Sequence, residues 1–184
     1  ILALAALAAS GWIADDLFDQ ASNQAGKEKE DAAKKIVAKA WLELPELVQK
    51  VWQESDGAPI NHCSLDQYLE EVRSMYHTTS PGKALPMVLQ AHQDLLTYSL
   101  ISLRLKCGEN DDQYLFFGKE MKRWMQNNIQ KQNGKNTLDT KSSLEQLEEF
   151  REIDGGFKFV LVFCLAVAGI QVDSSAYDLP QVHS

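Results

Sequence analysis

Apolar residues recur at three- and four-residue steps along most of this chain, and this spacing limits its fold more than any other feature. The stripes cover residues 32–52, 65–76, 86–105 and 114–129, and a shorter one follows over 144–153. Such steps place side chains on one face of an α-helix, whereas a half-buried strand needs strict alternation. The sequence therefore predicts an all-α protein, an irregular bundle of about six to eight helices.

Turn-forming residues predict where the helices begin and end. Pro45 interrupts the first long stripe, so we expect a kink or break near Leu44, with Pro45 opening a second helix. The polar stretch 20–30 is expected to be a loop. Pro86 and Gly108 should bound a helix with leucines on more than one side, which we expect to be the central and most buried one.

Two pairs of residues have the spacing of a capping box, in which a Ser and an acidic or amide residue three positions later cap each other's backbone. Ser64 with Gln67 predicts the start of the helix over 65–76. Ser142 with Glu145 predicts the start of a short acidic helix.

The chain opens with the apolar run ILALAALAASGWI. About 14 helical residues cover only ~21 Å, short of the ~30 Å hydrocarbon core of a bilayer. The small residues 8–10 resemble the end of a targeting segment, which indicates an organellar, lumenal or secreted protein processed upstream, without choosing among these locations. We expect residues 1–19 to form an apolar helix that docks on a hydrophobic surface, which is the chain's own core, a partner or a membrane. The candidate interface residues are Ile1, Leu2, Leu4, Leu7, Trp12 and Ile13.

A second uncharged run, residues 159–170, lies near the other end of the chain. Its twelve residues are too few to span a bilayer and predict a fully buried core helix. The high strand propensity of Phe159, Val160 and Val162 leaves a strand as the alternative. Residues 173–184 are polar and should form an extended tail, so residues 1–184 are expected to be a single helical domain with these two special ends.

The charges are unevenly distributed. The formal net charge of -8 excludes nucleic acid as a general partner, because phosphate binding needs an excess of Lys and Arg. A basic surface is nevertheless expected on the helix over 114–129, formed by Lys119, Lys122, Arg123 and Lys131. We expect it to face the acidic segment 145–154 that follows, and an acidic partner molecule is the alternative.

No catalytic, metal or cofactor site is predicted. The four histidines lack the spacing of metal ligands, and the common nucleotide-binding and hydrolase motifs are missing. Cys63, Cys107 and Cys164 have no metal-binding spacing, although a bridge between the first two stays open. Cys164 is expected to be a buried apolar residue.

The four tryptophans are the remaining signal, because Trp fills cores, anchors interfaces and lines apolar pockets. The candidate core or pocket residues are Trp41, Trp52, Trp124, Phe159 and Phe163. These observations favour a non-enzymatic helical protein that acts through protein contacts, as an accessory or scaffold subunit of a larger assembly. The alternatives are a helical carrier for an apolar ligand such as a lipid or pigment, and a membrane-inserting or pore-forming protein.

Overall fold

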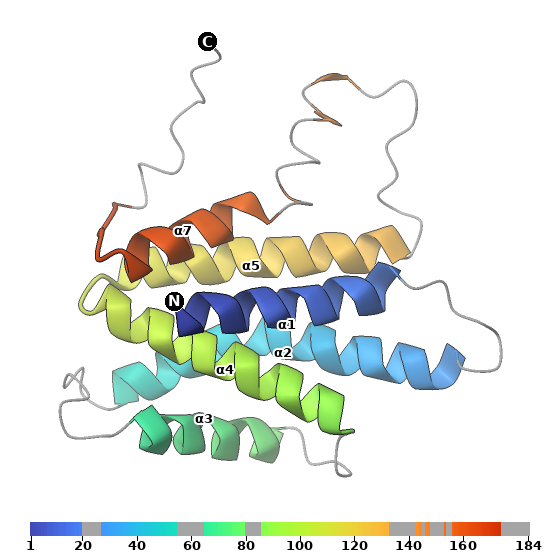
Figure 1. Cartoon of the computed structure of the whole chain (residues 1–184), viewed down its shortest axis with the longest axis horizontal. Helices are drawn as coiled ribbons and strands as arrows, with labels where there is room; N and C mark the ends of the chain where they lie inside the picture. The colour runs from blue at the N-terminus through green and yellow to red at the C-terminus, as the bar shows by residue number, and fades with distance from the viewer. Residues whose placement is uncertain are drawn as a thin grey trace.

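The computed structural model describes residues 1–19, 27–54, 65–79, 86–132, 143–144, 146–147, 153 and 156–173. These residues contain no strand, and the protein is all-α, as the apolar spacing predicts (Figure 1). The helices are α1 (Leu2–Asp19), α2 (Lys27–Glu54), α3 (Leu65–Thr79), α4 (Met87–Cys107), α5 (Asp111–Gln132) and α7 (Phe157–Val167).

Helix α4 holds the bundle together. It contacts α1, α2, α3, α5 and α7, which confirms the central position predicted from its leucines (Figure 1). Both predicted ends are also confirmed: Pro86 precedes the helix and Gly108 caps it. Gly108 has a φ of 57°, a left-handed conformation that favours glycine, and its N–H donates to the Arg104 carbonyl over 3.2 Å.

Helix α2 runs without a break through Pro45, so the predicted second helix at this residue is wrong. A proline removes one backbone hydrogen bond, and packing against α5 compensates for it. Gly118 of α5 lies so close that an added Cβ would stand 3.3 Å from the Cβ of Pro45. The Tyr114 hydroxyl also donates to the Pro45 carbonyl over 3.1 Å.

The beginning of α2 also differs from the expectation of a loop over residues 20–30. Residues 27–30 are helical, and residues 20–26 lie outside the described chain. Glu28 and Glu30 lie in the first turn, where acidic side chains interact favourably with the helix dipole. Glu30 also pairs with Lys34 one turn later over 2.8 Å, which stabilises this end of the helix.

Helix α1 docks on its own chain, against α4, α2 and α5. Its buried side is made largely of small residues one turn apart, which let the neighbouring backbone approach closely: Ala6, Ser10 and Ala14, with Leu7 and Phe18 beside them. Leu7, one of the predicted interface residues, is buried in the core of the chain's own bundle. Trp12 lies away from this side and is 72% exposed, whereas Ile1 and Leu2 are 99% and 75% exposed at the beginning of the helix.

Helix α7 is a helix rather than a strand, but the prediction that it is fully buried is wrong. Phe159, Val162, Phe163 and Ala166 are buried, whereas Val160, Leu161, Cys164 and Ile170 are exposed. The helix packs on α4 and α5 with one face only. Cys164 falls on the outer face and is an exposed free thiol, not the buried residue predicted.

Several sequence predictions fall outside the described residues: the cap at Ser64, the acidic segment except a few positions, the state of Cys63, and the tail beyond residue 173. Cys107 is a buried free thiol. A capping box does form near the predicted site, one residue later than expected. The Gln146 N–H donates to the Ser143 hydroxyl over 3.2 Å, and the Ser143 N–H donates to the Gln146 side-chain oxygen over 2.9 Å.

A buried arginine joins α2, α4 and α5 where α4 turns into α5. Arg104 is fully buried, pairs with Asp111, and donates to the Gly108 carbonyl over 2.9 Å. Its guanidinium lies 4.4 Å from the ring centroid of Trp52 and 5.3 Å from that of Tyr114. The charge is thus paired with one carboxylate and lies against two aromatic rings, while Nε and Nη1 have no hydrogen-bond partner among the described residues.

We expect the substitution Asp111→Asn to lower the free energy of unfolding by about 2 kcal/mol, because it leaves the Arg104 charge buried without its partner. The loss is smaller than for a fully buried pair, since the Asp111 side chain is 45% exposed. Urea denaturation measures it. Asp112→Asn is the matched control, because Asp112 lies in the same first turn, and should cost about 0.5 kcal/mol through the helix dipole alone. Equal losses in the two variants would contradict the role assigned to Arg104.

Candidate functional site

Trp41 is the centre of an aromatic cluster that contains the sequence-predicted residues Trp124 and Phe159. The Trp41 ring is fully buried and lies 4.8 Å from Trp124 and 6.2 Å from Phe159, centroid to centroid. Its indole N–H donates to Nε2 of His92 over 3.0 Å. The cluster therefore links α2, α4, α5 and α7 through one side chain.

The other two predicted core residues lie outside this contact set. Phe163 is buried against Phe117, with 5.9 Å between ring centroids. Trp52 is buried beside Arg104. All five candidate residues are thus core residues, and three of them also line a groove.

This apolar groove lies between α1 and α7 and has a volume of about 340 Å³. Trp41, Trp124 and Phe159 form its floor, while Trp12 and Val160 are exposed on its walls. The α1 wall runs from Leu4 to Asp15, a length of ~16 Å at 1.5 Å per helical residue. The complete lining is Leu4, Leu7, Ala8, Gly11, Trp12, Asp15, Trp41, Trp124, Phe159 and Val160.

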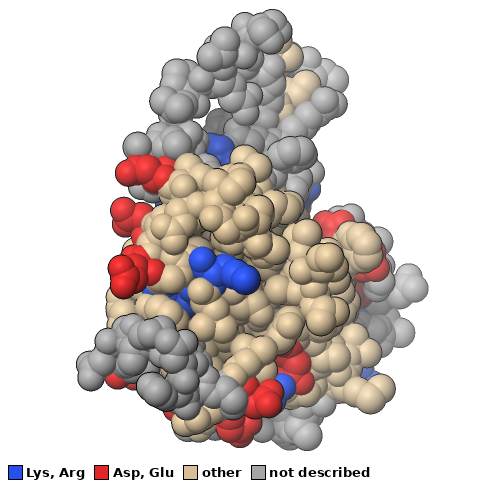
Figure 2. Space-filling model, turned by 60° about the vertical axis from the view of Figure 1, so that its left-hand side comes forward, with Lys and Arg blue, Asp and Glu red and all other residues tan. Residues whose placement is uncertain are grey.

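Of the predicted interface residues, Leu4, Leu7 and Trp12 line this groove, and Ile1, Leu2 and Ile13 do not. Ile1 and Leu2 are exposed at the end of the bundle where α4 ends and α5 begins. Figure 2 brings that end forward: uncharged residues cover most of its described surface, a small basic patch lies near the middle, and acidic residues lie around the margins.

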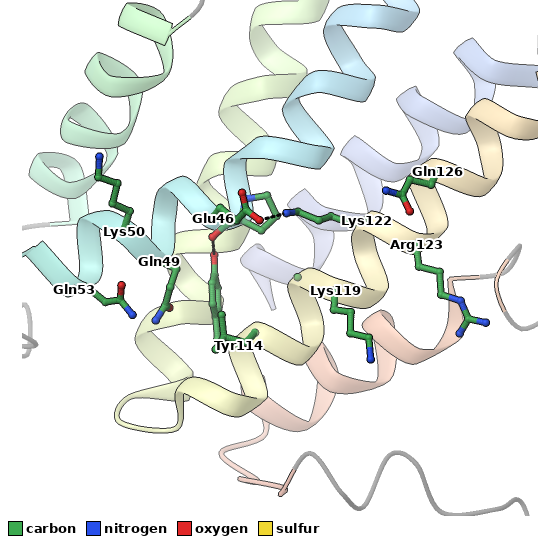
Figure 3. Close-up of a pocket in the computed structure, with 12 residues that line it drawn as sticks. Glu46, Gln49, Lys50, Gln53, Tyr114, Lys119, Lys122, Arg123 and Gln126 are labelled. Carbon is green, nitrogen blue, oxygen red and sulfur yellow. Dashed lines mark hydrogen bonds and ion pairs between the residues drawn. The ribbon is translucent and has the colours of Figure 1, made fainter.

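A second hollow, which we call the basic trough, lies between α2 and α5 and has a volume of about 590 Å³ (Figure 3). Three of the four predicted basic residues, Lys119, Lys122 and Arg123, line its α5 wall, and Lys131 does not. The α2 wall contributes Glu46, Gln49, Lys50 and Gln53, and the remaining lining residues are Pro45, Tyr114, Leu115, Gly118 and Gln126.

Some of the charged side chains that line the trough form ion pairs within the chain. Lys122 pairs with Glu46 across it, as the dashed line in Figure 3 marks. Arg123 pairs with Glu120 of its own helix over 3.7 Å, and Lys50 with Glu54 over 3.6 Å. The expected partner of the basic face was the acidic segment 145–154, and for Lys122 the observed partner is α2. The sequence did not predict this hollow. The spacing of apolar residues shows which face of a helix is buried, but it does not show where two neighbouring helices leave a gap between their side chains.

Two buried titratable side chains, His92 and Cys107, lie in the described core. His92 is buried, and its Nδ1 has no hydrogen-bond partner among the described residues. Burial raises the pKa of Cys107 to about 11, although the nearby Arg104 charge opposes the shift, so the thiol stays protonated at neutral pH. Among the described residues, no three His, Cys, Asp or Glu side chains are grouped to hold a metal ion.

The described helices also include none with the length and apolar character needed to cross a bilayer. Comparison of the chain with protein-family models, with curated proteins and with solved structures found no match.

The burial of His92 predicts a pH dependence of stability. Desolvation lowers its pKa from 6.5 to about 4, so protonation is harder in the folded protein than in the unfolded chain. The neutral form is the stable one: its contribution is complete above pH 6.5 and is lost as the pH falls toward 4. The full loss is about 3 kcal/mol at 1.36 kcal/mol per pKa unit.

We expect urea denaturation to show this loss in the native protein and not in His92→Gln, whose amide oxygen also accepts the Trp41 N–H but does not titrate. The difference between the two stability curves removes the contribution of carboxylates that titrate in the same range. Curves that stay parallel from pH 7 to pH 4 would contradict the assignment to His92.

Proposed function

We propose that this protein is a non-enzymatic binding module that works through contacts with other proteins, as an accessory or scaffold subunit of an assembly. The observation that carries the proposal is the apolar groove between α1 and α7, with Trp12 exposed on its wall. Exposed tryptophans are frequent anchors of protein interfaces, because one side chain buries a large apolar area.

The occupant we propose is an apolar helical segment of the partner protein. The α1 wall is ~16 Å long, the length of three helical turns, and is lined mainly by apolar side chains. A helix laid into such a groove buries apolar residues spaced three and four apart. It would contact the indole of Trp12 on one side and Val160 on the other.

A membrane is a poorer match for this face. Asp15 and Asp16 follow Trp12 on the same helix, and Asp15 lines the groove itself. The whole chain carries a formal net charge of -8. Anionic lipid surfaces repel such a face, whereas amphipathic membrane helices usually carry Lys and Arg beside their apolar residues.

An enclosed carrier site is also less well supported. That hypothesis needs a cavity between the Trp41 and Trp52 face of α2, the central helix and α7. Trp41 and Phe159 instead lie 6.2 Å apart, centroid to centroid, which is direct ring contact. The groove beside them is open to solvent, and small-molecule sites usually bury most of the ligand surface.

A synthetic helical peptide of about 14 residues (~21 Å) tests the proposal. It carries one stripe of Leu and Phe on an otherwise neutral polar helix, and calorimetry measures its Kd. We expect Trp12→Ala to weaken binding about tenfold, equivalent to 1.4 kcal/mol. Met87→Ala is the matched control, because Met87 is an equally exposed large apolar residue of α4 that does not line the groove.

The proposal fails if the peptide does not bind the native protein, or if Met87→Ala weakens binding as much as Trp12→Ala. Sedimentation with phosphatidylcholine vesicles provides a second arm. Vesicle binding that is lost in Trp12→Ala would assign the groove to a membrane instead of a protein.

A further inference from the structure

We propose that the basic trough between α2 and α5 is a second docking site, and that it takes an acidic amphipathic helix of a partner protein. The inference goes beyond the proposed function, because the trough shares no lining residue with the apolar groove. Figure 3 looks onto the trough with α1 on the far side of α2 and α5, so the two sites face different directions.

The trough forms where Gly118 of α5 lies close to Pro45 of α2. Gly118 and Pro45 meet at its floor, where an added Cβ on Gly118 would lie 3.3 Å from that of Pro45. The helices approach closely at this point, and longer side chains on either side also line the trough. The α5 wall extends from Tyr114 to Gln126, or ~18 Å, which equals about 12 residues of a docked helix.

Charge complementarity identifies the occupant. Four cations line the trough, Lys50 on the α2 wall and Lys119, Lys122 and Arg123 on the α5 wall, against the single carboxylate of Glu46. This local excess of positive charge stands on a chain with a formal net charge of -8. Lys119 is exposed and has no ion pair within the part of the chain that the structure describes. A partner that carries carboxylates on both sides of an apolar stripe matches this arrangement.

A buried amide provides a second and independent sign of a ligand. Gln49 lines the trough and is only 5% exposed. Neither its side-chain oxygen nor its nitrogen has a hydrogen-bond partner in the described residues. Buried amides in folded proteins are nearly always hydrogen-bonded, so an unpaired one beside an open trough points to a group supplied from outside.

The apolar part of the lining argues for a helix over other anions. Leu115 is 51% exposed at the trough, and Pro45 and Gly118 present no polar side chain. A nucleic acid backbone offers no apolar stripe for these residues, and binding it depends on a general excess of Lys and Arg. A fatty acid supplies one carboxylate, whereas the cations lie on both walls of the trough.

The test uses two fluorescent peptides of about 16 residues (~24 Å) that differ only in charge. One carries a leucine stripe flanked on both sides by Glu, and the other has Gln at those positions. Anisotropy measures their binding to the native protein at about 50 mM and about 300 mM salt, which shortens the screening length by a factor of about 2.4. We expect the Glu peptide to bind at least about tenfold more tightly at low salt, and the Gln peptide to show no salt dependence.

Variants of the protein localise the binding. We expect Lys119→Glu to raise the Kd of the Glu peptide about tenfold. Lys131→Glu is the matched control, because it makes the same charge change on the same helix outside the trough, and should alter the Kd by less than about twofold. Trp12→Ala should leave this Kd unchanged, so a failure of this site is distinct from a failure of the groove.

Three results would overturn the proposal. The first is equal binding of the Glu and Gln peptides, and the second is an equal effect of Lys119→Glu and Lys131→Glu. The third is displacement of the Glu peptide by sodium oleate or by a single-stranded oligonucleotide that itself binds with the same dependence on Lys119. That result would assign the trough to a small carboxylate or to a nucleic acid.

Discussion

The contacts of Trp41 hold the arrangement of this bundle. Its indole N–H must find an acceptor once it is buried, and it finds one in His92, which ties α2 to the central helix α4. The faces of the same ring meet Trp124 of α5 and Phe159 of α7, and Gly11 of α1 lies over its edge without a side chain. One hydrogen bond and two ring contacts of Trp41 therefore tie α2 to α4, α5 and α7. The burial of His92 as a neutral base follows from the same requirement.

This packing also produces the two outer hollows. Trp41, Trp124 and Phe159 of the aromatic cluster, from α2, α5 and α7, also line the apolar groove. On another face, α2 and α5 approach closely at Pro45 and Gly118, and the side chains around these two residues line the basic trough. A rigid core with two chemically different open faces suits a protein that brings two partners together, which is the role we propose for it.

The buried polar side chains of the bundle differ in how many partners they have. Arg104 pairs with one carboxylate and lies against two aromatic rings, while its Nε and Nη1 have no hydrogen-bond partner among the described residues. Neither side-chain polar atom of Gln49 on α2 has a partner among those residues. The first group stabilises the joint between α4 and α5, and the second marks the face where we place an external partner.

The sequence by itself determined the elements that depend on local periodicity and turn chemistry: the all-α class, the positions of α3, α4 and α5, and the caps at Pro86 and Gly108. It also placed Lys119, Lys122 and Arg123 on one surface, and Trp41, Trp124 and Phe159 in one core. Only the tertiary structure decided that α2 continues through Pro45, because the compensation comes from Gly118 and Tyr114, about 70 residues away. It alone decided that Leu7 is buried while Trp12 is exposed, and that α7 buries one face and leaves Cys164 outside. Hydropathy reports which residues favour burial, whereas the number of neighbouring helices decides which of them are covered.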